Sequence, residues 1–170
     1  GNLWSNGATT QSITVNQTGS YSVDVSENGC ESTSNAIEVI VNPTPVATIT
    51  ANGVATFCEG GSVTLTSNAS GLWSTGITGN SITVSEAGTY FITVSENNCS
   101  SQSNEIAVIV NDYPTVSISA SGATTFCEGE SVVLTSNVAT GNLWSNCATT
   151  QSITVNQTGS YSVEVSENGC

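Results

Sequence analysis

The chain has 170 residues, with thirteen Asp and Glu, no Lys, Arg or His, and a formal net charge of −13 at pH 7. Nucleic-acid backbones and anionic lipid surfaces are bound through Lys and Arg, so this composition excludes both as direct partners. No apolar run is long enough to span a bilayer, and we expect export and anchoring signals to lie outside this sequence.

The sequence is built from repeats. Residues 141–170 repeat residues 1–30 with two substitutions, and residues 71–99 form a looser copy. The motif Phe-Cys-Glu-Gly begins at Phe57 and recurs at Phe126, 69 residues later. Recurrence at a fixed period is typical of tandem architectures, and it predicts a domain of about 70 residues.

In chain order, we predict one complete domain between two partial ones. Residues 1–42 form a partial domain that holds only the later strands, and Pro43-Thr44-Pro45 is a stiff connector. Residues 46–111 form the complete domain. Residues 115–170 form a second partial domain that lacks its last strand.

The complete domain has an apolar-polar alternation of period two throughout, which is typical of half-buried strands. Gly or Asn marks each junction, and no helical periodicity competes. The expected fold class is therefore all-β, a small antiparallel sandwich. The predicted strands are residues 46–51, 62–67, 72–74, 81–84, 89–95 and 104–110.

Each copy has a Trp on its third predicted strand and a Gly-x-Tyr entering the penultimate strand. These core candidates are Trp4, Trp73, Trp144, Tyr21, Tyr90 and Tyr161. The arrangement resembles the core Trp and tyrosine corner of the immunoglobulin fold. The fuller pattern, including Cys-Glu-Gly-x-Ser-Val-x-Leu-Thr, resembles the immunoglobulin-like repeats of very large Bacteroidota cell-surface proteins. That family includes adhesins of gliding and attachment exported by the type IX route. The resemblance implies tandem immunoglobulin-like β-sandwiches in a linear array.

Six cysteines without a C-x-x-C pair indicate disulfides and an extracellular or periplasmic compartment. In an immunoglobulin topology Cys58 and Cys99 lie at opposite poles, about 20 Å apart, whereas a disulfide needs Cα atoms within about 7 Å. One pairing is therefore Cys58 with Cys170, across a domain junction. Cys30 and Cys99 would then pair with upstream residues and Cys127 with a downstream one. The alternative, Cys58 with Cys99 and Cys127 with Cys170 within domains, stays open.

Cys147 occupies a turn position where the other copies have Gly7 and Gly76. Three outcomes are open for its thiol: a crosslink to another chain, a bond to Cys127, or no partner.

No catalytic set can be assembled, because histidine and lysine, the usual acid-base groups and activated amines, are both absent. We therefore expect no enzymatic activity. Calcium is the one cofactor considered, with Glu59, Asp112 and Glu167 as candidate ligands near the junction. The alternative is that these are solvated turn carboxylates.

We expect a structural stalk or filament of an extracellular, cell-surface adhesin, whose disulfide-stabilised repeats give reach and tensile strength. Its partners would be neighbouring repeats and other copies of the fibre. Two alternatives are a glycan- or protein-binding immunoglobulin-like module and a self-assembling sheath or pilus-like polymer. Near-identity of the copies in their loops favours the stalk, because a binding module should differ from its neighbours there.

Overall fold

A computed structural model describes all 170 residues. Strands account for 46% of the residues and helices for none, which confirms the predicted all-β class. No element is a helix of the length and hydrophobicity needed to cross a membrane. The chain divides into two compact units, one of residues 1–46 with 95–101 and one of residues 47–94 with 102–170.

The first unit contains two small sheets. One has the order β1-β3-β4, with β1 (Asn2–Trp4), β3 (Val23–Glu27) and β4 (Cys30–Thr33) all antiparallel. The other is the antiparallel pair of β2 (Gly19–Tyr21) and β5 (Ile37–Val39). In this second sheet β5 has a partner on one edge only.

The second unit begins with a middle segment, residues 47–94 and 102–111, whose strands form two sheets. The larger sheet has the order β12-β11-β8-β6, with β9 also paired to β8. Its strands are β6 (Ile49–Ala51), β8 (Val63–Trp73), β9 (Thr78–Val84), β11 (Ile92–Glu96) and β12 (Cys99–Gln102). Residues 95–96 of β11 and 99–101 of β12 are grouped with the first unit.

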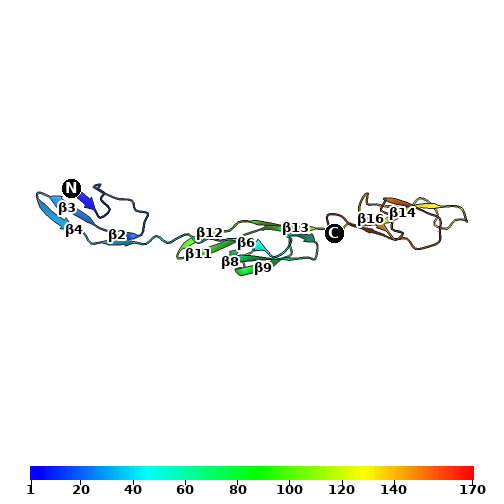
Figure 1. Ribbon diagram of the computed structural model, residues 1–170, viewed down its shortest axis with the longest axis horizontal. Helices are drawn as coiled ribbons and strands as arrows, with labels where there is room; N and C mark the ends of the chain where they lie inside the picture. Colours follow the sequence, from blue (N-terminus) through cyan, green and yellow to red (C-terminus); the bar gives the residue numbers. More distant parts are fainter. The chain divides into compact units, whose positions relative to one another are not determined.

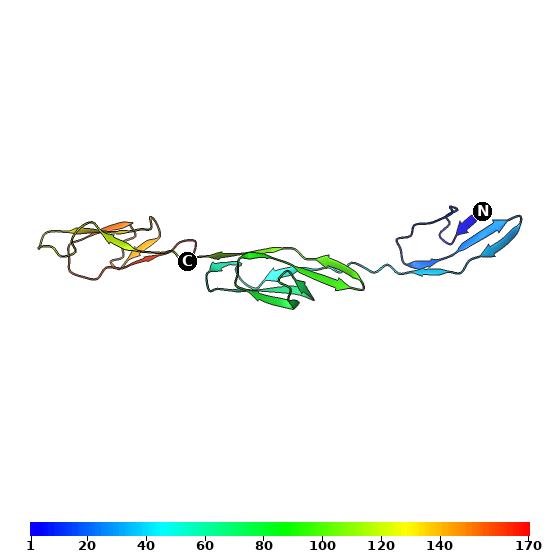
Figure 2. The ribbon, with the colours of Figure 1, turned by 180° about the vertical axis from the view of Figure 1, so that it is seen from behind.

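The smaller sheet of the middle segment has β13 (Ile106–Asn111) at its centre. β13 is antiparallel to β10 (Gly88–Tyr90) and parallel to β7 (Thr56–Cys58). β13 lies on the opposite side of the segment from β9 (Figure 1), and the view from behind shows the same separation (Figure 2). Between the sheets lies one core, in which Leu65, Trp73 and Ile92 are 0–1% exposed.

The observed strands correct several predicted ones. Residues 62–67 and 72–74 were expected as two strands, but β8 runs continuously through both, with a register shift between Thr66 and Gly71 opposite β9. Gly71 is needed there because an added Cβ would lie 2.3 Å from the Thr93 carbonyl oxygen. The predicted strand 89–95 is divided into β10 and β11, and β7 and β12 were not predicted.

The second unit ends with a C-terminal segment, residues 112–170. One sheet has the order β14-β15-β17, formed by β14 (Ile118–Ala120), β15 (Val132–Ser136) and β17 (Ser152–Val155). β16 (Asn142–Trp144) pairs with β18 (Val163–Val165). Its core is separate from the middle core and smaller: the buried members are Val132, Trp144, Ile153 and Val155.

Candidate functional site

Each copy of the repeat contains the same tight turn, and a cysteine follows it directly. Asn and Gly tolerate the left-handed backbone that two-residue hairpin turns require. In the first two copies the cysteine after the turn begins an outgoing strand, as Cys30 begins β4. The turn residues with positive φ are Asn28-Gly29, Asn97-Asn98 and Asn168-Gly169.

A disulfide joins Cys58 to Cys170, with Cα atoms 5.6 Å apart and a sequence separation of 112. Cys58 is the last residue of β7, which belongs to the middle segment. Cys170 follows the last turn of the C-terminal segment. The bond therefore connects covalently two segments that have separate cores.

Asn111, the last residue of β13, is central to the surroundings of this disulfide. Its register partner on β7 is Cys58, and its carbonyl oxygen accepts a hydrogen bond from the Glu59 amide at 2.9 Å. The Asn111 Nδ2 donates to the Asn168 carbonyl at 3.0 Å, and the Cys170 Sγ lies 3.8 Å from the Asn111 carbonyl oxygen. Asn111 thus holds the turn that presents Cys170 beside the strand that ends in Cys58.

The first unit contains the same arrangement around Asn42. The Asn42 Nδ2 donates to the Asn97 carbonyl at 2.9 Å, and the Cys99 Sγ lies 3.7 Å from the Asn42 carbonyl oxygen. Cys99, unlike Cys170, keeps a free thiol. The arrangement of asparagine, turn and cysteine therefore occurs twice, once with its disulfide and once without.

The structure brings Cys58 and Cys170 together, the pair that the sequence analysis placed across a domain junction. Since each is already bonded, neither member of the within-domain alternative is formed, neither Cys58 with Cys99 nor Cys127 with Cys170. The remaining four cysteines are free, and three of them are exposed: Cys30, Cys127 and Cys147, with Cys99 half-buried.

Cys147 lies in a turn with φ +68°, a left-handed conformation that Gly7 and Gly76 adopt in the other copies. Its amide donates to the Trp144 carbonyl at 2.8 Å, so the turn is the same as in those copies. The exposed thiol is bonded to no other cysteine, and a crosslink to another chain stays a prediction.

The calcium candidates Glu59, Asp112 and Glu167 are all exposed. No three Cys, Asp or Glu side chains in the chain lie together as a metal-binding group. The structure thus offers no assembled ligand set around these carboxylates, and calcium binding stays a prediction.

The aromatic residues expected in the cores differ in burial. Trp73 and Trp144 are each 1% exposed and Tyr90 is buried, but Trp4, Tyr21 and Tyr161 are only half-buried. Trp4 is the least enclosed Trp because residues 1–46 contain no counterpart of the strand residues Val63 and Leu65 that pack in the core of Trp73. In every copy the tyrosine hydroxyl donates to a backbone carbonyl four residues upstream, at 2.9–3.1 Å.

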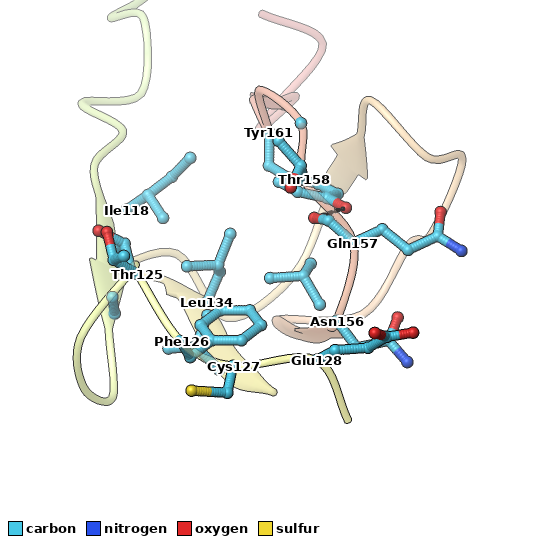
Figure 3. Close-up of a pocket in the computed structure, with 15 residues that line it drawn as sticks. Ile118, Thr125, Phe126, Cys127, Glu128, Leu134, Asn156, Gln157, Thr158 and Tyr161 are labelled. Carbon is cyan, nitrogen blue, oxygen red and sulfur yellow. Dashed lines mark hydrogen bonds between the residues drawn. The ribbon is translucent and has the colours of Figure 1, made fainter. Parts of the chain in front are cut away.

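Sequence reasoning missed two features of the site. One is the role of Asn42 and Asn111, although their recurrence after Ile-Val at the end of two copies was a usable signal. The other is a groove in the C-terminal segment, lined by apolar and polar residues of β14, β15, the Phe126 loop and residues 155–161 (Figure 3). The repeat pattern predicted that residues 115–170 lack their last strand, but not the groove itself.

No protein-family model matches the chain, and no curated protein matches it.

Proposed function

We propose that the chain is part of an extracellular fibre, the stalk of a bacterial cell-surface adhesin, and that its role is mechanical. In this proposal the fibre is a linear array of immunoglobulin-like β-sandwich domains, comprising residues 1–42, 46–111 and 115–170. The resemblance to Bacteroidota surface repeats supports attachment or surface gliding as the process served. No catalytic role and no cofactor are proposed.

The observation that carries the proposal is the disulfide between Cys58 and Cys170. It joins the strands of the middle core to the last turn of the C-terminal segment, and each of those segments buries its own core. A bond within one core would stabilise that core alone. A bond between segments also carries tension covalently from Cys58 to Cys170 and relieves the residues between them of load, which favours a mechanical role.

Composition supports the same role. With a net charge of −13 and no cationic side chain, every long-range interaction between segments or between fibres is repulsive. Such a surface favours a soluble, extended fibre and leaves no basic patch for an anionic ligand. The charge fits a spacer better than a binding module.

Attachment of cells under flow tests this proposal. Cells that carry the full protein with C58S/C170S should attach normally in still medium but detach at lower shear stress than wild-type cells. The matched control is C147S, which removes a thiol that forms no disulfide and should leave shear resistance unchanged. Loss of attachment in still medium, with the protein still displayed on the surface, would instead indicate a ligand-binding module.

A further inference from the structure

Cys58 and Cys170 are the pair that a disordered chain would join least often. They are 112 residues apart, whereas Cys30 and Cys99 lie only 28 and 41 residues from Cys58. Because the probability of loop closure falls with about the 3/2 power of loop length, an unfolded chain would bring Cys58 to Cys30 about eight times as often as to Cys170. The same ratio for Cys99 is about four to five. Chain statistics therefore oppose the observed disulfide.

Exposure does not favour this pair either. Cys58 and Cys170 are half-buried in the bonded structure. Three free thiols are exposed, and a small oxidant reaches exposed thiols more readily: Cys30, Cys127 and Cys147. The folded structure must therefore supply the feature that selects Cys58 and Cys170.

Asn111 is fixed to the middle segment by its backbone. It is the last residue of β13 and the register partner of Cys58 on β7. Its carbonyl oxygen accepts the Glu59 amide at 2.9 Å. The strand pairing therefore uses the backbone of Asn111 and leaves its side chain available for a contact outside the middle segment.

The side chain of Asn111 reaches the last turn of the C-terminal segment. The residues that flank this turn exchange both backbone hydrogen bonds, at 2.8 and 2.9 Å, so the carbonyls of the two central residues are outside that pairing. The first of them, Asn168, has φ +51° and accepts the Asn111 Nδ2 at 3.0 Å. The carbonyl oxygen of the second, Gly169, lies 3.6 Å from the Cys58 Sγ. Both central carbonyls thus face the strand ends of the middle segment, and Cys170 lies beside Cys58.

The two segments are joined by a short hinge. Asn137 donates to the Thr115 carbonyl at 3.0 Å and accepts the Ser117 amide at 2.7 Å, so the connector is held from residue 115 onward. Residues 112–114 belong to no strand, and such a hinge leaves one segment free to rotate against the other. The hydrogen bond from Asn111, the residue directly before the hinge, fixes the orientation in which the last turn meets β7.

The same contacts occur in the first unit, where no disulfide is present. The Asn42 Nδ2 donates to the Asn97 carbonyl at 2.9 Å, and Asn97 has φ +47°. Cys99 follows that turn with a free thiol, and its Sγ lies 3.7 Å from the Asn42 carbonyl oxygen. The hydrogen bond from the asparagine to the turn therefore forms without a disulfide to impose it.

We propose that Asn111 selects the cysteine pair: its side chain docks the last turn of the C-terminal segment first, and the disulfide forms second. Asn111 is a positioning residue for the two thiols and takes no part in the reaction itself. The group that it binds is the carbonyl of Asn168. This inference concerns how the bond is made and stands whether or not the chain is an adhesin stalk.

Oxidation then proceeds by thiol–disulfide exchange with a small disulfide such as oxidised glutathione. One protein thiolate attacks a glutathione sulfur, breaks the S–S bond and releases a glutathione thiolate. The other protein thiolate attacks the protein sulfur of the mixed disulfide and releases the second glutathione thiolate. The two protons lost by Cys58 and Cys170 are taken up by the two glutathione thiolates, and the two electrons reduce the glutathione disulfide. Docking favours the second step, because it places the second thiol within reach.

Equilibration with glutathione tests the proposal. The full chain, wild type or N111A, is equilibrated at set ratios of reduced to oxidised glutathione, quenched, alkylated and cleaved after glutamate, which places each cysteine on a separate peptide. The ratio of bonded to reduced Cys58 and Cys170 gives the effective concentration of one thiol at the other. We expect N111A to lower this effective concentration by about fivefold, because the net contribution of one hydrogen bond is lost. Bonds from Cys58 to Cys30 and Cys99 should increase.

Two variants and one further measurement separate docking from other effects. N111D keeps the shape of asparagine but has no N–H to donate at pH 7, so its loss should be at least as large as that of N111A. The matched control is N42A, which removes the same contact from Asn97 and should change the effective concentration by less than about twofold. Hydrogen exchange of β13 in the reduced chains should be equal in N111A and wild type, because the pairing of β13 uses the backbone.

Unfolding the chain should reverse the preference. In guanidinium chloride the Cys58–Cys30 and Cys58–Cys99 products should exceed Cys58–Cys170, as their shorter loops require. Removal of the denaturant in the same glutathione buffer should restore Cys58–Cys170 as the main product in the wild type, and more slowly in N111A.

Four results would overturn the proposal. They are an effective concentration within about twofold of wild type in both N111A and N111D, an equal loss in N42A, a loss of β13 protection in reduced N111A, and Cys58–Cys170 as the main product in guanidinium chloride. None of these results bears on whether the bond, once formed, carries load, which attachment under flow tests separately.

Discussion

Removal of the disulfide should destabilise the two cores of the second unit unequally. The perturbation is C58S/C170S, which removes both sulfurs and leaves no new free thiol. Cys58 is held against Asn111 by the pairing of β7 with β13. When the C-terminal segment alone unfolds, the disulfide therefore closes a loop of about 59 residues, the separation of Asn111 and Cys170.

The chain-entropy model gives about 4 kcal/mol for a loop of this length. We expect the unfolding free energy of residues 112–170 to fall by about 2–4 kcal/mol in the variant, since measured values are often below the model. The middle core, which includes Leu65 and Trp73, should change by less than about 1 kcal/mol, because its strands remain paired without the bond.

Hydrogen exchange read by mass spectrometry measures this difference, because it reports the opening free energy of each segment separately. The control is C147S, which removes a thiol without removing a disulfide. An equal loss of protection in both segments would refute the reasoning, because it would mean that the two cores unfold as one. No loss in residues 112–170 would refute it as well.

Three further predictions follow from burial and backbone geometry. W73A should lower the free energy of unfolding by about 3–5 kcal/mol and W4A by clearly less, because Trp73 is 1% exposed and Trp4 is half-buried. Thermal unfolding measures both losses, and equal losses would contradict the assigned cores. G141A should lower the free energy of unfolding by roughly 1–3 kcal/mol or more, because the backbone has φ +74° and a Cβ would lie 2.1 Å from the Ser166 carbonyl oxygen. An unchanged free energy in urea denaturation would show that this close contact is wrong. C147G should raise the free energy of unfolding by about 1 kcal/mol or less, since glycine adopts the left-handed turn freely. A lower melting temperature would contradict this, because it would mean that the Cys147 side chain makes stabilising contacts.

Much of the fold could be predicted from sequence because its signals are local. Period-two alternation identified the strands around Val63 and Leu65, and Asn-Gly pairs identified the turns. Elements that depend on distant pairing were missed. β7 looks like a loop by its Phe-Cys-Glu-Gly motif and becomes a strand only because β13, some fifty residues later, pairs with it in parallel.

The candidate site was also predicted only in part. The pairing of Cys58 with Cys170 was one of two alternatives, and it was favoured because a strand length separates Cys58 from Cys99 in an immunoglobulin topology. The groove beside Phe126 was not predicted, although the repeat pattern had indicated that residues 115–170 lack their last strand. Phe126 and Phe57 have the same local sequence, and only Phe57 has a strand like β13 alongside.

The most direct test of the mechanical account is single-molecule extension of the full chain, pulled from its two ends with and without reductant. The disulfide excludes the residues between Cys58 and Cys170 from the path of tension, a separation of 112 residues. At 3.3–3.6 Å per extended residue, reduction should lengthen the fully unfolded chain by about 370–400 Å. Equal lengths in the oxidised and reduced states would contradict the claim that tension passes through this bond.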